Sequence, residues 1–220
     1  IKKEVIKFWK NNPDTFHSMK EKCPDYHRVI TPEIANNYAV GAVRHTTYFF
    51  PWNNDPCKFN ESIYERWRYS KYVSGLKYDE YEKNTPKDGS VDRIQIVCYP
   101  PKYGGVEKHI DTISNCNLAI SCHLSSKNTF GFSSGGFYCL NKNKERIDIE
   151  QHIDMGDMSL FCPTIEHGVY PIDSHSNIDN YDWNSGIGRW WMELFQNDSN
   201  EQVKRVTSKS LEKYHFQTIK

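Results

Sequence analysis

The most informative segment of the sequence is IQIVCYPPKYGGVEKHID, from Ile94 to Asp111. It begins with a strand-like apolar run, turns at paired prolines and glycines, and ends on a His-x-Asp pair. Residues two apart on a strand point to the same face of the sheet. The imidazole of His109 and the carboxylate of Asp111 can therefore converge on one metal ion.

A third metal ligand must come from elsewhere, and His167 in PTIEHGVY (163–170) is the best match. Two histidines and one carboxylate on one face leave coordination positions open. That arrangement suits ferrous iron in an oxygenase, because substrate, cosubstrate and O₂ must all reach the metal. Other interpretations stay open here. HxD pairs are common without a metal, a histidine before glycine is often a loop residue, and zinc also accepts this ligand set.

The C-terminal two-thirds of the chain predicts a β-rich structure. Short strand-like runs follow one another from Val91, separated by Gly, Pro, Asn and Ser. Such a series is typical of a sandwich or barrel. The expected strands are 93–99, 117–124, 136–140, 147–152, 159–162 and 189–196.

The N-terminal third predicts mainly helix. Apolar residues near helical spacing favour a helix over 1–22, interrupted at 11–13, with a second one starting near Thr15 or Phe16. Pro32 is well placed to open another helix. A strand is expected over 42–52, because it is rich in β-branched and aromatic residues. A further helix over 60–75 would face Ile63, Trp67 and Tyr72 inward, and a closing helix is expected over 204–213.

The sequence resembles the Fe(II)- and 2-oxoglutarate-dependent oxygenases at several points in order. The stretch 94–111 resembles the family's strand, turn and HxD unit, and MGDMSLFCPTIEHGV (155–169) resembles its Gly-Asp turn, strand and distal histidine. Gly135-Gly136 fits the paired glycine between these units. Arg189, in GRWWMELF, lies where the family places a basic residue. The resemblance covers 91–195, roughly half of the chain.

That resemblance implies a double-stranded β-helix, a jelly-roll or cupin-like barrel with iron held near its open end by His109, Asp111 and His167. Together with the helices expected above, the fold class is mostly β with flanking helices and a helical N-terminal third. We expect one oxygenase domain over 1–220. It divides into a helix-rich support region (1–90), a jelly-roll core (91–196) and a C-terminal extension (197–220).

The resemblance also implies Fe(II) as cofactor, with 2-oxoglutarate and O₂ as cosubstrates. The far carboxylate of 2-oxoglutarate is expected to meet Arg189, because a guanidinium is always charged and its fork matches a carboxylate. A surface salt bridge is the alternative for Arg189. Two features depart from the family pattern: the long polar insert 173–188 before Arg189, and Trp191 where many members carry serine. We expect Tyr99 to replace that hydroxyl contact, with an ordinary core tyrosine as the alternative.

The expected activity is that of a dioxygenase that hydroxylates, or otherwise oxidises, an unactivated C–H bond of a small molecule, with release of succinate and CO₂. Because Asp111 is present, hydroxylation rather than halogenation is the default. Expected substrate contacts are Arg44, His45, Lys108 and Thr112. Three alternatives stay open: the same chemistry on a protein or peptide side chain, a non-catalytic metal-binding cupin-like barrel, and a zinc hydrolase. No motif names the substrate.

The charge balance, the apolar runs and the cysteine content indicate which partners and which compartment to expect. The chain has 28 basic and 28 acidic residues, so it lacks the basic field of a nucleic-acid binder. No run approaches the roughly 20 apolar residues of a membrane helix. Seven cysteines without a CxxC pair disfavour a disulfide framework or zinc ribbon. We therefore expect a cytoplasmic protein without nucleic-acid or membrane partners, and the sequence predicts no oligomeric state.

Overall fold

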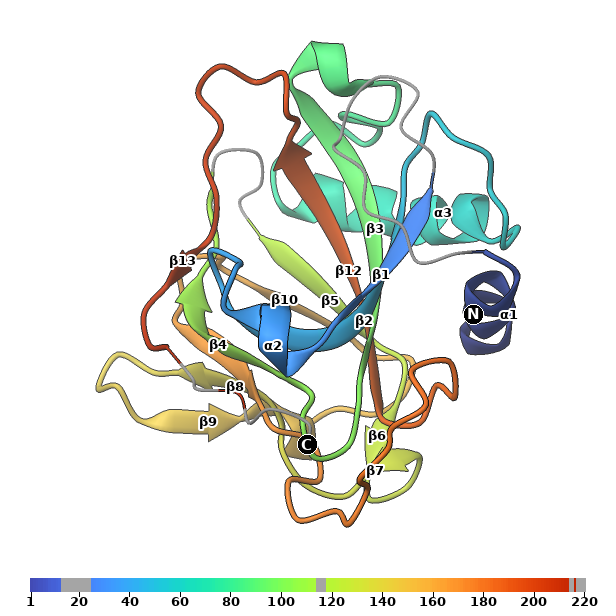
Figure 1. Ribbon diagram of the computed structural model, residues 1–220. Coiled ribbons are helices and arrows are strands. Elements are labelled where there is room, and N and C mark those ends of the chain that lie inside the picture. Colours follow the sequence, from blue (N-terminus) through green and yellow to red (C-terminus); the bar gives the residue numbers. More distant parts are fainter. Residues whose placement is uncertain (13–24, 114–117, 214–215, 217–220) are drawn as a thin grey trace.

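The computed structural model describes residues 1–220 except 13–24, 114–117, 214–215 and 217–220. Its main feature is a curled antiparallel sheet of 11 strands, flanked by few helices (Figure 1). The helices are α1 (Lys2–Asn11), α2 (Pro32–Ala35), α3 (Asn60–Val73), and the 3-10 turns η1 (Pro86–Asp88) and η2 (Ile149–Gln151). None of these helices has the length and apolar character needed to cross a bilayer.

The first strands along the chain are β1 (Tyr26–Ile30), β2 (Ala42–Phe49), β3 (Ser90–Tyr99), β4 (Gly105–Ile110) and β5 (Ala119–His123). The strands that follow are β8 (Gly136–Leu140), β9 (Arg146–Asp148), β10 (Met158–Phe161), β11 (His167–Tyr170), β12 (Arg189–Asp198) and β13 (Lys209–Ser210). A separate parallel pair is formed by β6 (Ser126–Lys127) and β7 (Gly131–Phe132).

The sheet has two halves that share β2. One half has the order β10-β5-β12-β3-β2, and the other β4-β11-β8-β9. The first residues of β2, Ala42 and Val43, pair with β4, whereas 45–49 pair with β3. Strand β2 therefore forms backbone hydrogen bonds with both halves and links them.

Strands β3 and β12 form the longest ladder, from Arg189 opposite Tyr99 to Asp198 opposite Ser90. Successive side chains alternate between the two faces of a strand. On one face, Ile94, Ile96, Trp190, Met192 and Leu194 join the main hydrophobic core, against which Trp9 of α1 and Trp67 of α3 pack. Each such buried side chain contributes roughly 1.5–3 kcal/mol. The opposite face is left to line a cavity.

The mostly β character of the chain is confirmed, but the helical N-terminal third is wrong. Between α1 and α3 the described chain holds only the four-residue α2, and β1 pairs with the outer edge of β2 along its full length. The run YHRVI (26–30), for which the sequence predicted no element, pairs there as a strand. The helix expected near Thr15 or Phe16 lies outside the described residues.

Three smaller expectations are also wrong. Tyr72 of α3 is 72% exposed, while Ile63 and Trp67 are buried as predicted. The expected strand over 147–152 ends at Asp148 and continues as η2. The expected closing helix over 204–213 is an extended segment whose strand β13 pairs with β4, because this polar run has no apolar stripe to bury as a helix.

Candidate metal centre

Three predicted side chains converge where β4 and β11 pair. His109 lies directly opposite His167 in this ladder. Asp111 follows the end of β4, and its backbone N–H donates to the carbonyl of Pro163 at 2.9 Å. One ligand atom of each residue lies within 4.8 Å of the others, the one such group of three among the described residues. Local pairing therefore brings together residues 56 positions apart.

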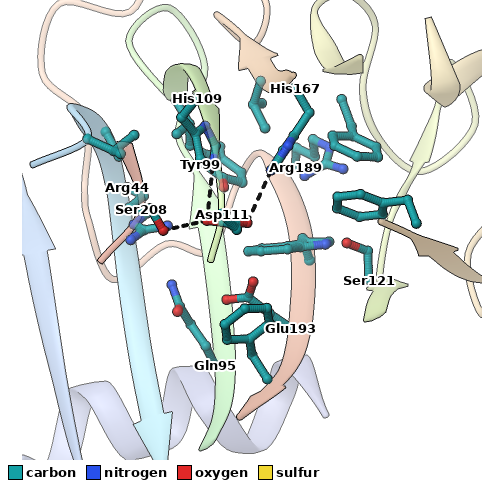
Figure 2. A pocket seen from close by; sticks show the side chains of 18 of the residues that line it. Arg44, Gln95, Tyr99, His109, Asp111, Ser121, His167, Arg189, Glu193 and Ser208 are labelled. Atoms are coloured by element: carbon teal, nitrogen blue, oxygen red, sulfur yellow. Dashed lines mark hydrogen bonds and ion pairs between the residues drawn. The ribbon is translucent and has the colours of Figure 1, made fainter. Parts of the chain in front are cut away.

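Both histidines are oriented by backbone carbonyls. Nδ1 of His109 lies 2.8 Å from the carbonyl oxygen of Glu107, and Nδ1 of His167 lies 2.8 Å from that of Ile165. A carbonyl oxygen only accepts, so each Nδ1 carries a proton and donates it. Each Nε2 then faces Asp111, at 3.7 Å for His109 and 3.3 Å for His167 (Figure 2).

The electrostatics of His109, Asp111 and His167 favour a bound cation between them. Burial lowers the pKa of His109 to about 4. The pKa of Asp111 is held below its usual range, because the two histidines outweigh the effect of burial. Burial opposes charge on His167, yet its hydrogen bond with Asp111 raises its pKa. Two imidazole nitrogens and a carboxylate that meet at one point are stabilised by a shared cation, and a divalent metal fits this donor set.

A cavity of about 140 Å³ adjoins the three residues. Its walls are the inward faces of β2, β3 and β12 together with parts of β4, β5, β8, β10 and β11, and several of the side chains that line them are charged. Three arginines line it, Arg44, Arg93 and Arg189, along with Glu193. Arg44 and Arg189 lie on opposite sides of Asp111 (Figure 2).

Arg189 is held in place by a second buried charge. It is 1% exposed, and its Nε donates to Oε1 of Glu150, which also accepts the Phe137 N–H at 3.0 Å. Its Nη1 is buried and has no hydrogen-bond partner among the described residues. A buried donor without an acceptor costs about 1–3 kcal/mol. A carboxylate ligand in the cavity would relieve that cost.

Tyr99 lies between the two arginines. It is 1% exposed, the Arg189 guanidinium carbon is 5.6 Å from its ring centroid, and it hydrogen-bonds Arg44. Burial raises the pKa of the Tyr99 phenol. Nε of Arg44 is buried without a partner among the described residues. Tyr99 thus keeps the two guanidinium groups apart, and each has an unused donor.

Glu193 lies on the cavity wall of β12. Its carboxylate is 3.5 Å from Nη2 of Arg93. Burial, and then the negative charge of Asp111, raise the pKa of Glu193 to about 7. A carboxylate this poorly compensated favours a cationic or hydrogen-bond-donating neighbour.

Three residues predicted to contact substrate lie elsewhere. The ring of His45 stacks on Trp9 at 3.6 Å and hydrogen-bonds His27 at 2.9 Å. Nζ of Lys108 is 2.9 Å from Glu212. Neither residue lines the cavity, and neither does Thr112. The period-2 alternation of β2 and β4 explains this for His45 and Lys108, because their neighbours Arg44 and His109 take the inward face.

Sequence reasoning missed Glu150, Glu193 and Ser208. Glu193 carries a usable signal, since it lies four residues after Arg189 on one strand and so shares its face. Glu150 and Ser208 carry none. Both reach the site from segments whose placement depends on the fold.

Comparison with solved structures agrees with this architecture. A prolyl hydroxylase from Trichoplax adhaerens, in complex with a hypoxia inducible factor oxygen degradation domain peptide fragment, superimposes with a TM-score of 0.50. The identity is 12%, over 91% of this chain and 78% of that one. The chain shares the fold of a prolyl hydroxylase. The resemblance to the Fe(II)/2-oxoglutarate oxygenases is thereby confirmed at the level of the fold.

Two other structures are similar over much of the chain. A Pseudomonas putida prolyl-4-hydroxylase matches with a TM-score of 0.46 and 13% identity, over 71% of this chain and 70% of that one. A cupin-like protein from Thermotoga maritima matches with a TM-score of 0.32 and 8% identity, over 90% and 89%. No family model and no curated protein matches the sequence.

Proposed function

We propose that this chain is a non-haem Fe(II)- and 2-oxoglutarate-dependent dioxygenase. The observation that carries the proposal is the convergence of His109, Asp111 and His167 at the edge of a cavity lined by buried Arg189. Nη1 of this arginine has no hydrogen-bond partner within the part of the chain that the structure describes. In this proposal the three converging residues hold the metal. When bound, iron and 2-oxoglutarate supply the family's oxidising chemistry, which releases succinate and CO₂ as a C–H bond is oxidised.

The sheet order supports the finer fold assignment that this function needs. Strands β3, β12, β5 and β10 form one antiparallel set of four, and β4, β11, β8 and β9 form another. We take these eight strands as a double-stranded β-helix, the jelly-roll architecture. We further propose that 1–220 acts as one domain with its core over 91–196.

Arg189 and Tyr99 are the proposed cosubstrate contacts. The unused Nη1 of Arg189 binds the far carboxylate of 2-oxoglutarate, while Glu150 keeps the guanidinium plane fixed through Nε. The Tyr99 ring excludes water beside it, which strengthens a charge-assisted hydrogen bond. Arg189 alone separates this proposal from a metal-storing barrel, which has no use for a buried cation opposite its metal.

Arg44 is the proposed substrate contact, and it favours an anionic small molecule. Its Nε has no hydrogen-bond partner among the described residues and lies across Asp111 from Arg189, so one cavity offers two separate carboxylate sites. The volume of about 140 Å³ suits a small ligand. The Trichoplax adhaerens enzyme holds a peptide fragment, so a peptide side chain is the competing substrate class.

Anaerobic titration tests the proposed function. Fe(II) and then 2-oxoglutarate, added to the metal-free protein, are expected to give a visible metal-to-ligand charge-transfer band, and admission of O₂ should release succinate slowly even without substrate. Candidate amino acids, other small carboxylates and peptides are then screened for faster succinate release. A protein that binds zinc tightly, gives no such band and forms no succinate would contradict the oxygenase assignment and favour the zinc hydrolase.

A further inference from the structure

The C-terminal segment reaches back to the metal-binding edge of the sheet. After β12 the chain crosses the molecule and adds the short strand β13 to β4, the strand that carries His109 (Figure 1). Ser210 lies opposite His109, and Lys209 lies opposite Ile110. The same antiparallel register, continued by one residue, sets Ser208 opposite Asp111.

Ser208 contacts a proposed metal ligand directly. Its hydroxyl donates to Oδ1 of Asp111, and Ser208 lines the cavity (Figure 2). Oδ2 of Asp111 is the oxygen that faces His167. The serine therefore fixes the plane of the carboxylate through Oδ1, the oxygen that also faces His109 at 3.7 Å, while Oδ2 stays directed toward His167.

Ser210, two residues after Ser208, makes a similar side-chain hydrogen bond. Its hydroxyl donates to Oε2 of Glu107 at 2.8 Å, and the Gly41 N–H donates to the same oxygen at 2.8 Å. Glu107 is fully buried, and its backbone carbonyl accepts from Nδ1 of His109. The two serines, at 208 and 210, therefore contact the carboxylates at the two ends of the segment 107–111.

Backbone contacts anchor this segment on both sides of the serines. The Leu211 N–H donates to the carbonyl of Lys108 at 2.8 Å, and the Val206 N–H donates to Oδ2 of Asp198 at 2.9 Å. Glu212 pairs with Lys108 at 2.9 Å. The strand is held independently of the two hydroxyls, so loss of one hydroxyl should leave the backbone in place.

We propose that Ser208 is a positioning residue for the metal centre, and that the C-terminal strand completes this centre from outside the barrel core. The inference rests on the proposed metal role of Asp111. Hydrogen-bond partners of metal ligands typically change metal affinity 10- to 100-fold when removed. By the reciprocity of linked equilibria, metal binding must in turn stabilise the docking of this strand.

The test measures Mn(II) affinity of the full-length protein by the electron paramagnetic resonance signal of free Mn(II), without turnover. Ser208→Ala should weaken binding roughly 10- to 100-fold, and Ser208→Thr, which keeps a hydroxyl, should restore most of it. Lys209→Ala is the matched control, since this exposed neighbour points away from the site, and should bind as the parent does. Metal-free thermal unfolding checks that every variant is folded.

Hydrogen exchange gives a second readout. Mn(II) should slow exchange of the backbone amides over 206–213 in the parent, and this protection should shrink in Ser208→Ala. Equal Mn(II) affinity of Ser208→Ala and parent would overturn the positioning role and leave the oxygenase proposal standing. If the parent itself binds no Mn(II), the metal centre fails, and this inference fails with it.

Discussion

At the residue scale, the site is defined by which buried histidine and arginine nitrogens already have a hydrogen-bond partner and which do not. Both histidines donate Nδ1–H to a carbonyl two residues earlier in the chain, so their Nε2 atoms are committed to the shared point at Asp111. Arg189 and Arg44 each keep one buried donor unused among the described residues. An unsatisfied buried donor is unfavourable, and at the wall of a cavity a bound ligand can satisfy it.

Asp111→Ala should remove metal binding and succinate formation together. The two remaining imidazoles lose the carboxylate that completes the group of three among the described residues, and incomplete ligand sets bind weakly. Mn(II) binding and succinate release measure the two effects. The exposed neighbour Ile113→Ala is the control. Succinate formation at the parent's rate in Asp111→Ala would exclude Asp111 from the ligand set.

Arg189→Met is expected to affect stability and cosubstrate binding separately. It leaves the Glu150 carboxylate buried without its cation, which costs about 3–5 kcal/mol. Adding Glu150→Gln should recover most of that loss in urea unfolding. The double variant should still fail to bind 2-oxoglutarate in calorimetry of the Mn(II)-loaded protein. Arg44→Met, on the other side of Asp111, should retain this binding. If Arg44→Met loses 2-oxoglutarate binding and the double variant retains it, Arg44 rather than Arg189 is the cosubstrate contact.

At the scale of elements, a buried ion pair joins α3 to β3. Nζ of Lys71 lies 2.6 Å from Oδ2 of Asp92, both side chains are fully buried, and Nζ also donates to the carbonyl of Glu80. Burial raises the pKa of Asp92 to about 6 in spite of Lys71. The pair fixes how α3 lies on the outer face of the sheet, opposite the cavity.

Lys71→Met should lower the free energy of unfolding by about 3–5 kcal/mol at pH 7, because Asp92 is left buried without its cation and keeps only the hydrogen bond from Gln196 among the described residues. Lys71→Met with Asp92→Asn should be clearly more stable than Lys71→Met alone. Urea unfolding measures both, and the exposed Lys77→Met should stay within about 0.5 kcal/mol of the parent. If the single and double variants are equally unstable, packing rather than charge accounts for the loss.

At the scale of the whole molecule, closing the sheet traps ionisable groups between its two halves. His123 of β5 is fully buried, with Nε2 3.0 Å from Oγ of Ser159. Burial, followed by the charge of Arg189, lowers the pKa of His123 to about 3. The cost of enclosing such groups appears only when the chain folds, so it makes global stability depend on pH.

Acid should destabilise the protein partly through His123. Its pKa is lower in the folded chain than in the unfolded one, so below pH 6.5 the unfolded state binds more protons and stability falls. Between pH 6.5 and pH 4.5 this difference in proton binding lowers the free energy of unfolding by about 2.3 kcal/mol, because the unfolded imidazole is already half protonated at pH 6.5. The unfolding free energy from urea titrations at pH 6.5 and pH 4.5 should therefore drop less in His123→Gln than in the parent. The exposed His175→Gln should keep the parent's drop, and an equal drop in His123→Gln would remove this histidine from the pH dependence.

Local sequence patterns were enough to predict the mostly β core and to place His109 and Arg189 on strands. Alternation along β4 and β12 puts His109 and Arg189 on inward faces. This alternation can be predicted from the residues of each strand alone. The turn and HxD pattern of 94–111 is local in the same sense.

Which distant segments complete the site depends on the folded arrangement of the chain. Glu150 meets Arg189 across 39 positions and Ser208 meets Asp111 across 97, and no local pattern encodes either contact. The same holds for the N-terminal third, where 26–30 becomes a strand because the edge of β2 is available to pair with it. Backbone pairing at an open sheet edge depends on what lies beside a segment, and that information is absent from the segment itself.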